Sequence, residues 1–131
     1  TGSYWLSAAP IAAAIACVDK MRSLDVAKLC AAKGRKLTDG LVAASRRHGF
    51  DLRVTGEPAM WFMRQSDDPD FVLHQAWVAE CVRRGVFFTN HHNLFINAAL
   101  SDDDIAFTLE VADEAFAQVA KADPRAALKG R

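Results

Sequence analysis

The sequence predicts an α+β fold in which helices cover one face of a small sheet, after a long helical segment. Two observations carry this prediction. Apolar residues recur at helical spacing near both ends of the chain, whereas short strand-like runs separated by turn residues occupy the middle. The resulting order is helix, helix, strand, strand, helix, strand, strand, helix. The 131 residues suit one domain that buries about two-thirds of the surface its unfolded chain exposes.

Two helices are predicted in the first third of the chain. Residues Leu6–Met21 are alanine-rich and apolar nearly all round, which favours a core helix packed on several sides, able to lean away from the sheet layer. Residues Asp25–His48 carry apolar side chains at helical spacing, and Gly49 supplies a stop. Gly34 and Gly40 weaken this second helix, so they indicate close packing or a bend.

The middle of the chain changes to strand-like patterns. Leu52–Val54 and Ala59–Arg64 are predicted strands, because the residues between them, Thr55 to Pro58, are typical of a turn. A helix should follow from about Pro69 to Arg84, with Gly85 ending it. Its expected buried stripe is Val72 or Leu73, Ala76, Trp77, Cys81 and Val82.

Two further strands and a final helix complete the predicted fold. Strands at Val86–Thr89 and Leu94–Ala98 would flank a short polar loop. Ser101 and Asp104 resemble a capping box that opens the last helix, which continues to about Lys121. Its apolar residues recur at helical spacing, namely Ile105, Leu109, Ala112, Phe116 and Val119. The rest of the chain is expected to be loosely held.

Composition argues against several partners. Sixteen basic residues balance sixteen acidic ones and form no basic stripe, so we expect no nucleic-acid binding. The longest apolar run, Trp5–Val18, is too short to cross a bilayer and lacks a basic N-terminal flank, so we expect neither a membrane span nor a secretory signal. Cys17, Cys30 and Cys81 are far apart and odd in number, which indicates reduced, partly buried thiols in a cytoplasmic protein.

The loop His91, His92 and Asn93 is the main candidate for function. Polar residues held between two strands can line a pocket, although they can equally form an exposed turn. A metal site with His48 or His74 is a weaker alternative, because adjacent histidines in an extended segment point to opposite sides. The sequence contains no nucleophile elbow, P-loop or dinucleotide fingerprint.

The start of the chain is a second candidate. Thr1, Gly2 and Ser3 precede the first helix, whose free amides and dipole would suit an anion such as phosphate, although they also suit a simple cap.

Taken together, three segments resemble class III aminotransferases of the glutamate-1-semialdehyde aminomutase-like group. They are TGSYW before an alanine-rich helix, VTGEPAMWFMR, and RRGVFFTNHHNLFINAALSDDDIAFTLEVADEAF. The likeness covers nearly all of Thr1 to Lys121 and agrees in order and spacing. Asn90, Leu94 and the pair Leu100-Ser101 depart from the group's usual residues, which puts the substrate in doubt more than the fold.

The resemblance implies the C-terminal portion of a fold type I enzyme that uses pyridoxal 5'-phosphate (PLP) and works as a homodimer. It implies that Gly2 and Ser3 contact the cofactor phosphate, and that His91, His92 and Asn93 face the substrate, an amino donor or a carbonyl acceptor. It divides the chain into a linking helical segment at 1–48, a small domain at 49–121 and a flexible tail at 122–131.

No lysine here stands in the strand-and-turn context of the family's Schiff-base lysine, so catalytic residues are expected upstream and the 131 residues alone should be inactive. The open alternatives are a non-catalytic α+β module that dimerises through its first helix and a small metal-binding domain.

Overall fold

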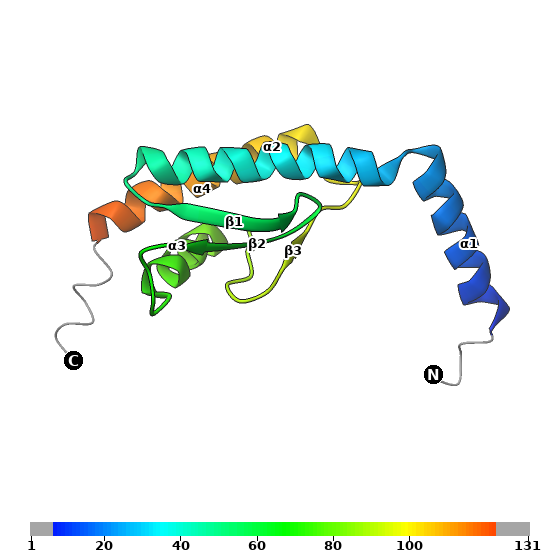
Figure 1. Ribbon diagram of the computed structural model, residues 1–131, viewed down its shortest axis with the longest axis horizontal. Helices are drawn as coiled ribbons and strands as arrows, with labels where there is room; N and C mark the ends of the chain where they lie inside the picture. The colour runs from blue at the N-terminus through cyan, green and yellow to red at the C-terminus, as the bar shows by residue number, and fades with distance from the viewer. Residues whose placement is uncertain (1–6, 123–131) are drawn as a thin grey trace.

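A three-stranded antiparallel sheet lies at the centre of the computed structural model, which describes residues 7–122. The strands β1 (Leu52–Glu57), β2 (Met60–Gln65) and β3 (Leu94–Phe95) follow in the order β1-β2-β3. The helices are α1 (Ala8–Ser23), α2 (Val26–Arg47), α3 (Val72–Arg83) and α4 (Asp102–Ala122). Figure 1 shows α2 and α4 lying together along one side of the sheet, while α1 projects from the N-terminal end of α2. The predicted α+β architecture is confirmed.

Alternation along the strands explains why helices cover only one face. In β2, Trp61, Met63 and Gln65 are buried, whereas of the residues between them Phe62 is half-buried and Arg64 is exposed. The register pairs Leu52 with Gln65 and Val54 with Met63, so β1 contributes its apolar residues to the same face. This face packs against the helices, and the opposite face stays open.

A stack of aromatic rings joins the helices to the chain that follows α3. The Trp77 ring of α3 lies 5.2 Å from that of Phe88 and 4.7 Å from that of Phe116 in α4, both nearly parallel to it. Its indole nitrogen donates a hydrogen bond of 3.2 Å to the Ala112 carbonyl, so the buried ring leaves no polar atom unpaired.

The predicted strand at Val86–Thr89 is wrong, and the one at Leu94–Ala98 is reduced to Leu94–Phe95. Burial still alternates through the first segment, since Val86 and Phe88 are buried and Phe87 is exposed. On the side of β2 away from β1, the strand that pairs is β3, through Met60 and Trp61, and residues 86–89 form no ladder with either strand. The alternating burial of these side chains therefore results from packing against the helices and does not indicate a paired strand.

The predicted buried stripe of α3 is only partly right. Trp77 and Cys81 are buried as expected, but Val82 is 45% exposed, and His74 and Val78 are buried instead. Burial raises the pKa of the Cys81 thiol to about 12, which leaves it protonated and unreactive near neutral pH. Cys30 is also buried, whereas the expectation that Cys17 is partly buried is wrong because α1 is open.

The expectation that α1 is a core helix packed on several sides is wrong within the part of the chain that the structure describes. None of its residues is buried, and Ile11, Ile15, Val18 and Met21 are between 44% and 59% exposed. The chain turns between α1 and α2 at Asp25, whose φ of 45° is left-handed. This turn directs α1 away from the sheet (Figure 1). Its apolar side chains can therefore pack against another surface. This agrees with the expectation that the first helix leans away from the sheet layer.

No helix in the described range 7–122 is long and apolar enough to cross a membrane.

The final helix begins as expected: the Asp104 amide donates to the Ser101 hydroxyl at 3.0 Å, and the Ser101 amide donates to the Asp104 carboxylate at 2.8 Å. These reciprocal bonds are those of a capping box with Asp in place of Glu.

Both glycines inside α2 are positions of close packing. A Cβ atom at Gly34 would overlap the backbone carbonyl of Pro58 in the β1–β2 turn, so Gly34 lets the hairpin lie directly on the helix. At Gly40 the Cβ would instead meet the methyl groups of Leu109, the end of a flexible side chain.

We expect Gly34→Ala to lower the free energy of unfolding by about 2 kcal/mol, because a rigid backbone carbonyl must move and this outweighs the gain in helix propensity. Gly40→Ala is the matched control, in which a turn of the Leu109 side chain should keep the change within about 1 kcal/mol. Urea unfolding followed by circular dichroism measures both. Equal losses for the two variants would contradict this account of Gly34.

Candidate functional site

Phe71 is the residue around which the polar loop is organised. It precedes α3 with a φ of 59°, a left-handed conformation that is an outlier for a bulky residue. Such backbone conformations are found at sites where the surrounding structure fixes them. The left-handed turn brings the Phe71 ring between β2 and the loop.

Three side chains from different elements meet this ring. The guanidinium carbon of Arg64, on β2, lies 5.1 Å from the ring centroid of Phe71. The His91 ring approaches edge-on at 4.9 Å with an interplanar angle of 62°. From α3, the His74 ring lies at 6.3 Å, also edge-on. Phe71 thus holds the loop histidine and a strand arginine near each other.

His92 and Asn93 continue the loop on its other side. The His92 ring lies 6.4 Å from that of Phe95, and its Nδ1 is 3.1 Å from the Asn93 carbonyl. Because a carbonyl only accepts, Nδ1 carries the proton in this contact, and Nε2 of the neutral ring is left as an acceptor. Thr89 donates its hydroxyl to the His92 carbonyl at 3.1 Å, which ties the loop to the segment before it.

Beneath Phe71 lies a buried imidazole. His74 is fully buried, and its ring nitrogens make no hydrogen bond within the described residues, although its backbone amide donates to the Asp68 carboxylate at 2.8 Å. Burial, the largest cause, lowers the pKa of His74; the nearby His91 and Arg64 act in the same direction, and Asp68 opposes them. His74 is therefore neutral in the folded protein near neutral pH.

The structure brings together some predicted site residues and separates others. His91, His92 and Asn93 are exposed on one loop, but the two histidine rings turn toward different aromatic partners. No group of three or more His, Cys, Asp or Glu side chains within residues 7–122 is arranged to hold a metal ion. Gly2 and Ser3 lie outside the described residues.

Sequence reasoning missed Arg64 and Phe71 as neighbours of the loop. Arg64 is the outward residue between Met63 and Gln65, so strict alternation in β2 already placed it on the open face. Phe71 gave no such signal, because a left-handed conformation at an aromatic residue is not encoded in any local pattern.

The described lysines do not suit a covalent bond to PLP. Lys33 donates its ammonium group to the backbone carbonyls of Ala98 and Leu100, and so ties α2 to the turn before α4. Lys36 pairs with Asp102 at 2.7 Å. Lys20, Lys28 and Lys121 are exposed on helices.

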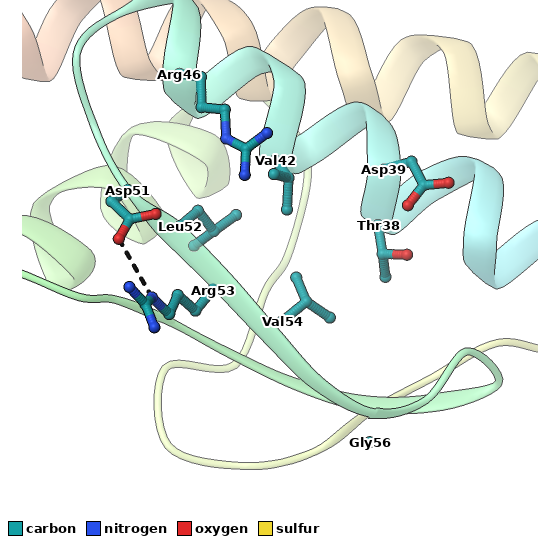
Figure 2. Close-up of a pocket in the computed structure, with 9 residues that line it drawn as sticks. All are labelled: Thr38, Asp39, Val42, Arg46, Asp51, Leu52, Arg53, Val54 and Gly56. Atoms are coloured by element: carbon teal, nitrogen blue, oxygen red, sulfur yellow. Dashed lines mark hydrogen bonds and ion pairs between the residues drawn. The ribbon is translucent and has the colours of Figure 1, made fainter.

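A separate hollow of about 410 Å³ lies between α2 and the outer edge of β1 (Figure 2). Its charged residues, two of each sign, are Asp39, Arg46, Asp51 and Arg53. Asp51 accepts a hydrogen bond of 3.2 Å from Arg53, and the neighbouring Ser66 and Arg53 side chains lower the pKa of its carboxyl group. None of the predicted site residues lines this hollow.

Comparison with curated proteins identifies several relatives. The chain is 43% identical over 119 residues to an aminopentol aminotransferase of Sphingopyxis macrogoltabida, covering 91% of this chain and 28% of the relative. It is 33% identical over 109 residues to a glutamate-1-semialdehyde 2,1-aminomutase of Psychrobacter arcticus, covering 70% and 25%. A 3-aminobutyryl-CoA aminotransferase of Cloacimonas acidaminovorans is 27% identical over 114 residues, covering 85% and 28%. No family model matches the chain.

A solved structure shares the fold as well as the sequence. The FumI protein of Sphingopyxis sp. MTA144, in its PLP internal aldimine form, superposes with a TM-score of 0.88 at 42% identity and covers 92% of this chain. The chain is similar in sequence and in fold to the C-terminal portion of class III, fold type I aminotransferases. It spans between 25% and 28% of the length of these curated relatives. The described part of the chain includes the loop and Phe71, while most of the length of its relatives has no counterpart in the 131 residues.

We expect the stability of this protein to fall as the pH drops from about 6.5 to 5, because His74 takes up a proton in the unfolded chain but not in the folded one. The loss cannot exceed about 1.4 kcal/mol per pH unit for one proton. In His74→Phe this dependence should disappear. Urea unfolding at pH 7.5, 6.5 and 5.5 measures it.

His92→Gln is the matched control, since this exposed histidine should leave the dependence unchanged. The depressed carboxyl pKa values, such as that of Asp104, affect stability only at lower pH. The same pH dependence in His74→Phe and in the wild type would contradict this role of His74.

Proposed function

We propose that this chain is the C-terminal part of a PLP-dependent aminotransferase or aminomutase. The complete protein would move an amino group between an amino compound and a keto acid or aldehyde. The observation that carries the proposal is the likeness to FumI, a protein solved with PLP, at 42% identity over 92% of this chain. PLP, when bound, supplies the electron sink for this class of reaction.

In this proposal the chain divides near residue 48. Residues 1–48 would link to the large cofactor domain, 49–121 would form the small domain, and 122–131 would be a tail. The exposed apolar surface of α1 supports contact with that domain or with a second subunit, because isolated surface helices in water seldom expose so many large apolar residues. We propose a homodimer located in the cytoplasm.

His91, His92 and Asn93 would form part of the substrate wall. Phe71 holds His91 by ring contact, and His92 is oriented by the Asn93 carbonyl so that its Nε2 is left for a substrate hydroxyl or ammonium group. Gly2 and Ser3 would contact the cofactor phosphate. None of these residues would exchange a proton with the reacting carbon, and the Schiff-base lysine would lie upstream of residue 1.

A non-catalytic dimerisation module is the alternative. The bare apolar surface of α1 suits it, but the relatives named above are aminotransferases and an aminomutase. The two proposals differ in whether PLP is bound by the complete polypeptide.

We expect the complete polypeptide to show the absorbance band of lysine-bound PLP near the edge of the visible spectrum, and residues 1–131 alone to lack it. Borohydride reduction followed by peptide mass spectrometry locates the modified lysine. PLP trapped on Lys20, Lys28 or another lysine of this chain would contradict the proposal. A complete polypeptide that binds no PLP would favour the dimerisation module.

A further inference from the structure

A series of ring contacts joins the exposed loop to the core. The His91 ring of the loop lies edge-on against Phe71 at 4.9 Å, and the ring of His74, on α3, lies 6.3 Å from the same Phe71 ring. One turn further along α3, the Trp77 ring lies 5.9 Å from that of His74. His74 therefore connects Phe71, which touches the loop, with the fully buried Trp77.

His74 is a polar side chain in an apolar position. None of its surface is exposed, and within residues 7–122 neither of its ring nitrogens makes a hydrogen bond. A neutral imidazole has one N–H donor and one acceptor nitrogen, and leaving both unpaired in the interior costs stability. A phenylalanine would fill a comparable space without this cost. A buried polar group without a partner calls for an explanation, and a role in function is one.

The backbone ties His74 to Phe71 through Asp68. Phe71 donates its amide to the Asp68 carbonyl at 3.2 Å, and His74 donates its amide to the Asp68 carboxylate at 2.8 Å. The three residues therefore form one hydrogen-bonded turn at the start of α3. Within this turn Phe71 has its left-handed φ of 59°, a conformation that persists only where neighbouring groups fix it. A movement of the His74 ring or of the Asp68 carboxylate therefore acts directly on Phe71.

Three charged or titratable groups act on the His74 ring. Burial lowers the pKa of the ring most; Asp68, before α3, raises it, and His91 of the loop and Arg64 of β2 lower it. A protonated ring has two N–H donors and no acceptor. The anionic group among these three is the Asp68 carboxylate, which already accepts the His74 amide. A proton on the ring therefore requires that the turn at the start of α3 rearranges.

We propose that His74 is a positioning residue of the substrate wall: its neutral ring holds Phe71 and the polar loop in place, and its protonation releases them. The step is the transfer of one proton from solvent to a ring nitrogen. The inference rests on the proposed function, because it takes the loop as part of the substrate pocket. It makes substrate binding weaker in acid, and it gives the unpaired ring nitrogens a function.

Amide hydrogen exchange in the complete PLP-loaded protein tests the structural part. We expect the protection of residues 71–75, corrected for intrinsic exchange rates, to fall by about tenfold between pH 7.5 and 5.5. The reason is that a released histidine, with an ordinary pKa of about 6.5, takes up a proton over this range. The helix α4 should remain more protected than residues 71–75 at both pH values, because the release is local.

In His74→Phe the ring cannot take up a proton, so the protection of residues 71–75 should be the same at both pH values. His74→Gln, which is neutral but polar, is a second variant with the same expectation if the core does not accept phenylalanine. His48→Gln is the matched control, because this histidine at the end of α2 contacts Asp113 of α4 at 3.0 Å. It should keep the tenfold change of the wild type.

The KM for the amino donor tests the link to the substrate wall. For each protein the ratio of KM at pH 5.5 to KM at pH 7.5 is divided by the same ratio for His74→Phe, which cancels the titration of the substrate and of PLP. We expect a quotient of about three to ten for the wild type and for His48→Gln, because only the closed fraction binds substrate. The corresponding quotient for kcat should stay within about twofold, since the released loop affects binding.

Phe71→Leu removes the ring contact with His91 at every pH. This variant should therefore have a raised KM already at pH 7.5, and a KM quotient near that of His74→Phe. A low KM at pH 7.5 that still rises in acid as in the wild type would contradict the role of Phe71 in transmitting the change.

Equal loss of protection in His74→Phe and in the wild type would overturn the inference, and so would exchange in α4 that becomes as fast as in residues 71–75. A wild-type KM quotient of one would overturn the role of His74 in the substrate wall, even if protection is lost as expected. A complete polypeptide that binds no PLP would instead contradict the proposed function, and hydrogen exchange in that protein would still decide whether His74 holds Phe71.

Discussion

The burial of Trp77 is the interaction on which the rest of this structure depends. Its ring joins α3 to Phe116 of α4 on one face and to Phe88 on the other, and its nitrogen reaches a backbone carbonyl of α4. Because the stack fixes Phe88, it also fixes where the chain emerges toward His91. The distance from core to loop is only three residues, so the position of the candidate site follows from core packing.

Much of the fold could be predicted because it follows from side-chain periodicity. The helical spacing in α2 and α4 and the capping pair Ser101 and Asp104 are local signals that the structure confirms. The hairpin is also present, but the turn predicted at Thr55 to Pro58 lies at residues 58 and 59, because β1 continues to Glu57 and pairs there with Met60. The prediction of a strand at Val86–Thr89 was wrong because strand formation depends on contacts with residues distant in the sequence. Its alternation reports which side chains are buried, whereas a strand also needs backbone hydrogen bonds to a neighbouring strand, and on that side of β2 the strand that pairs is β3. For α1, composition predicted that its apolar side chains pack against another surface. No local pattern shows whether that surface belongs to the 131 residues or lies outside them.

The candidate site was predictable to a smaller extent. A polar loop could be recognised from His91, His92 and Asn93, since they interrupt apolar residues. Its neighbours could not, because Arg64 and Phe71 reach it from residues more than 15 positions away along the chain, through a left-handed turn. The pattern of adjacent histidines did predict correctly that the two rings diverge, and each has its own aromatic partner. Chemistry carried by single residues was therefore easier to infer than the contacts that orient them.

The bare helix α1 has a thermodynamic consequence. A helix of 16 residues with none of them buried is only marginally stable in water, because little apolar surface offsets the entropy lost when its backbone is ordered. A surface that covered α1 would therefore supply most of the free energy that keeps it helical. Folding of this segment and its assembly onto such a surface would be one coupled equilibrium, and slow amide hydrogen exchange in α1 would report assembly rather than the intrinsic stability of the helix.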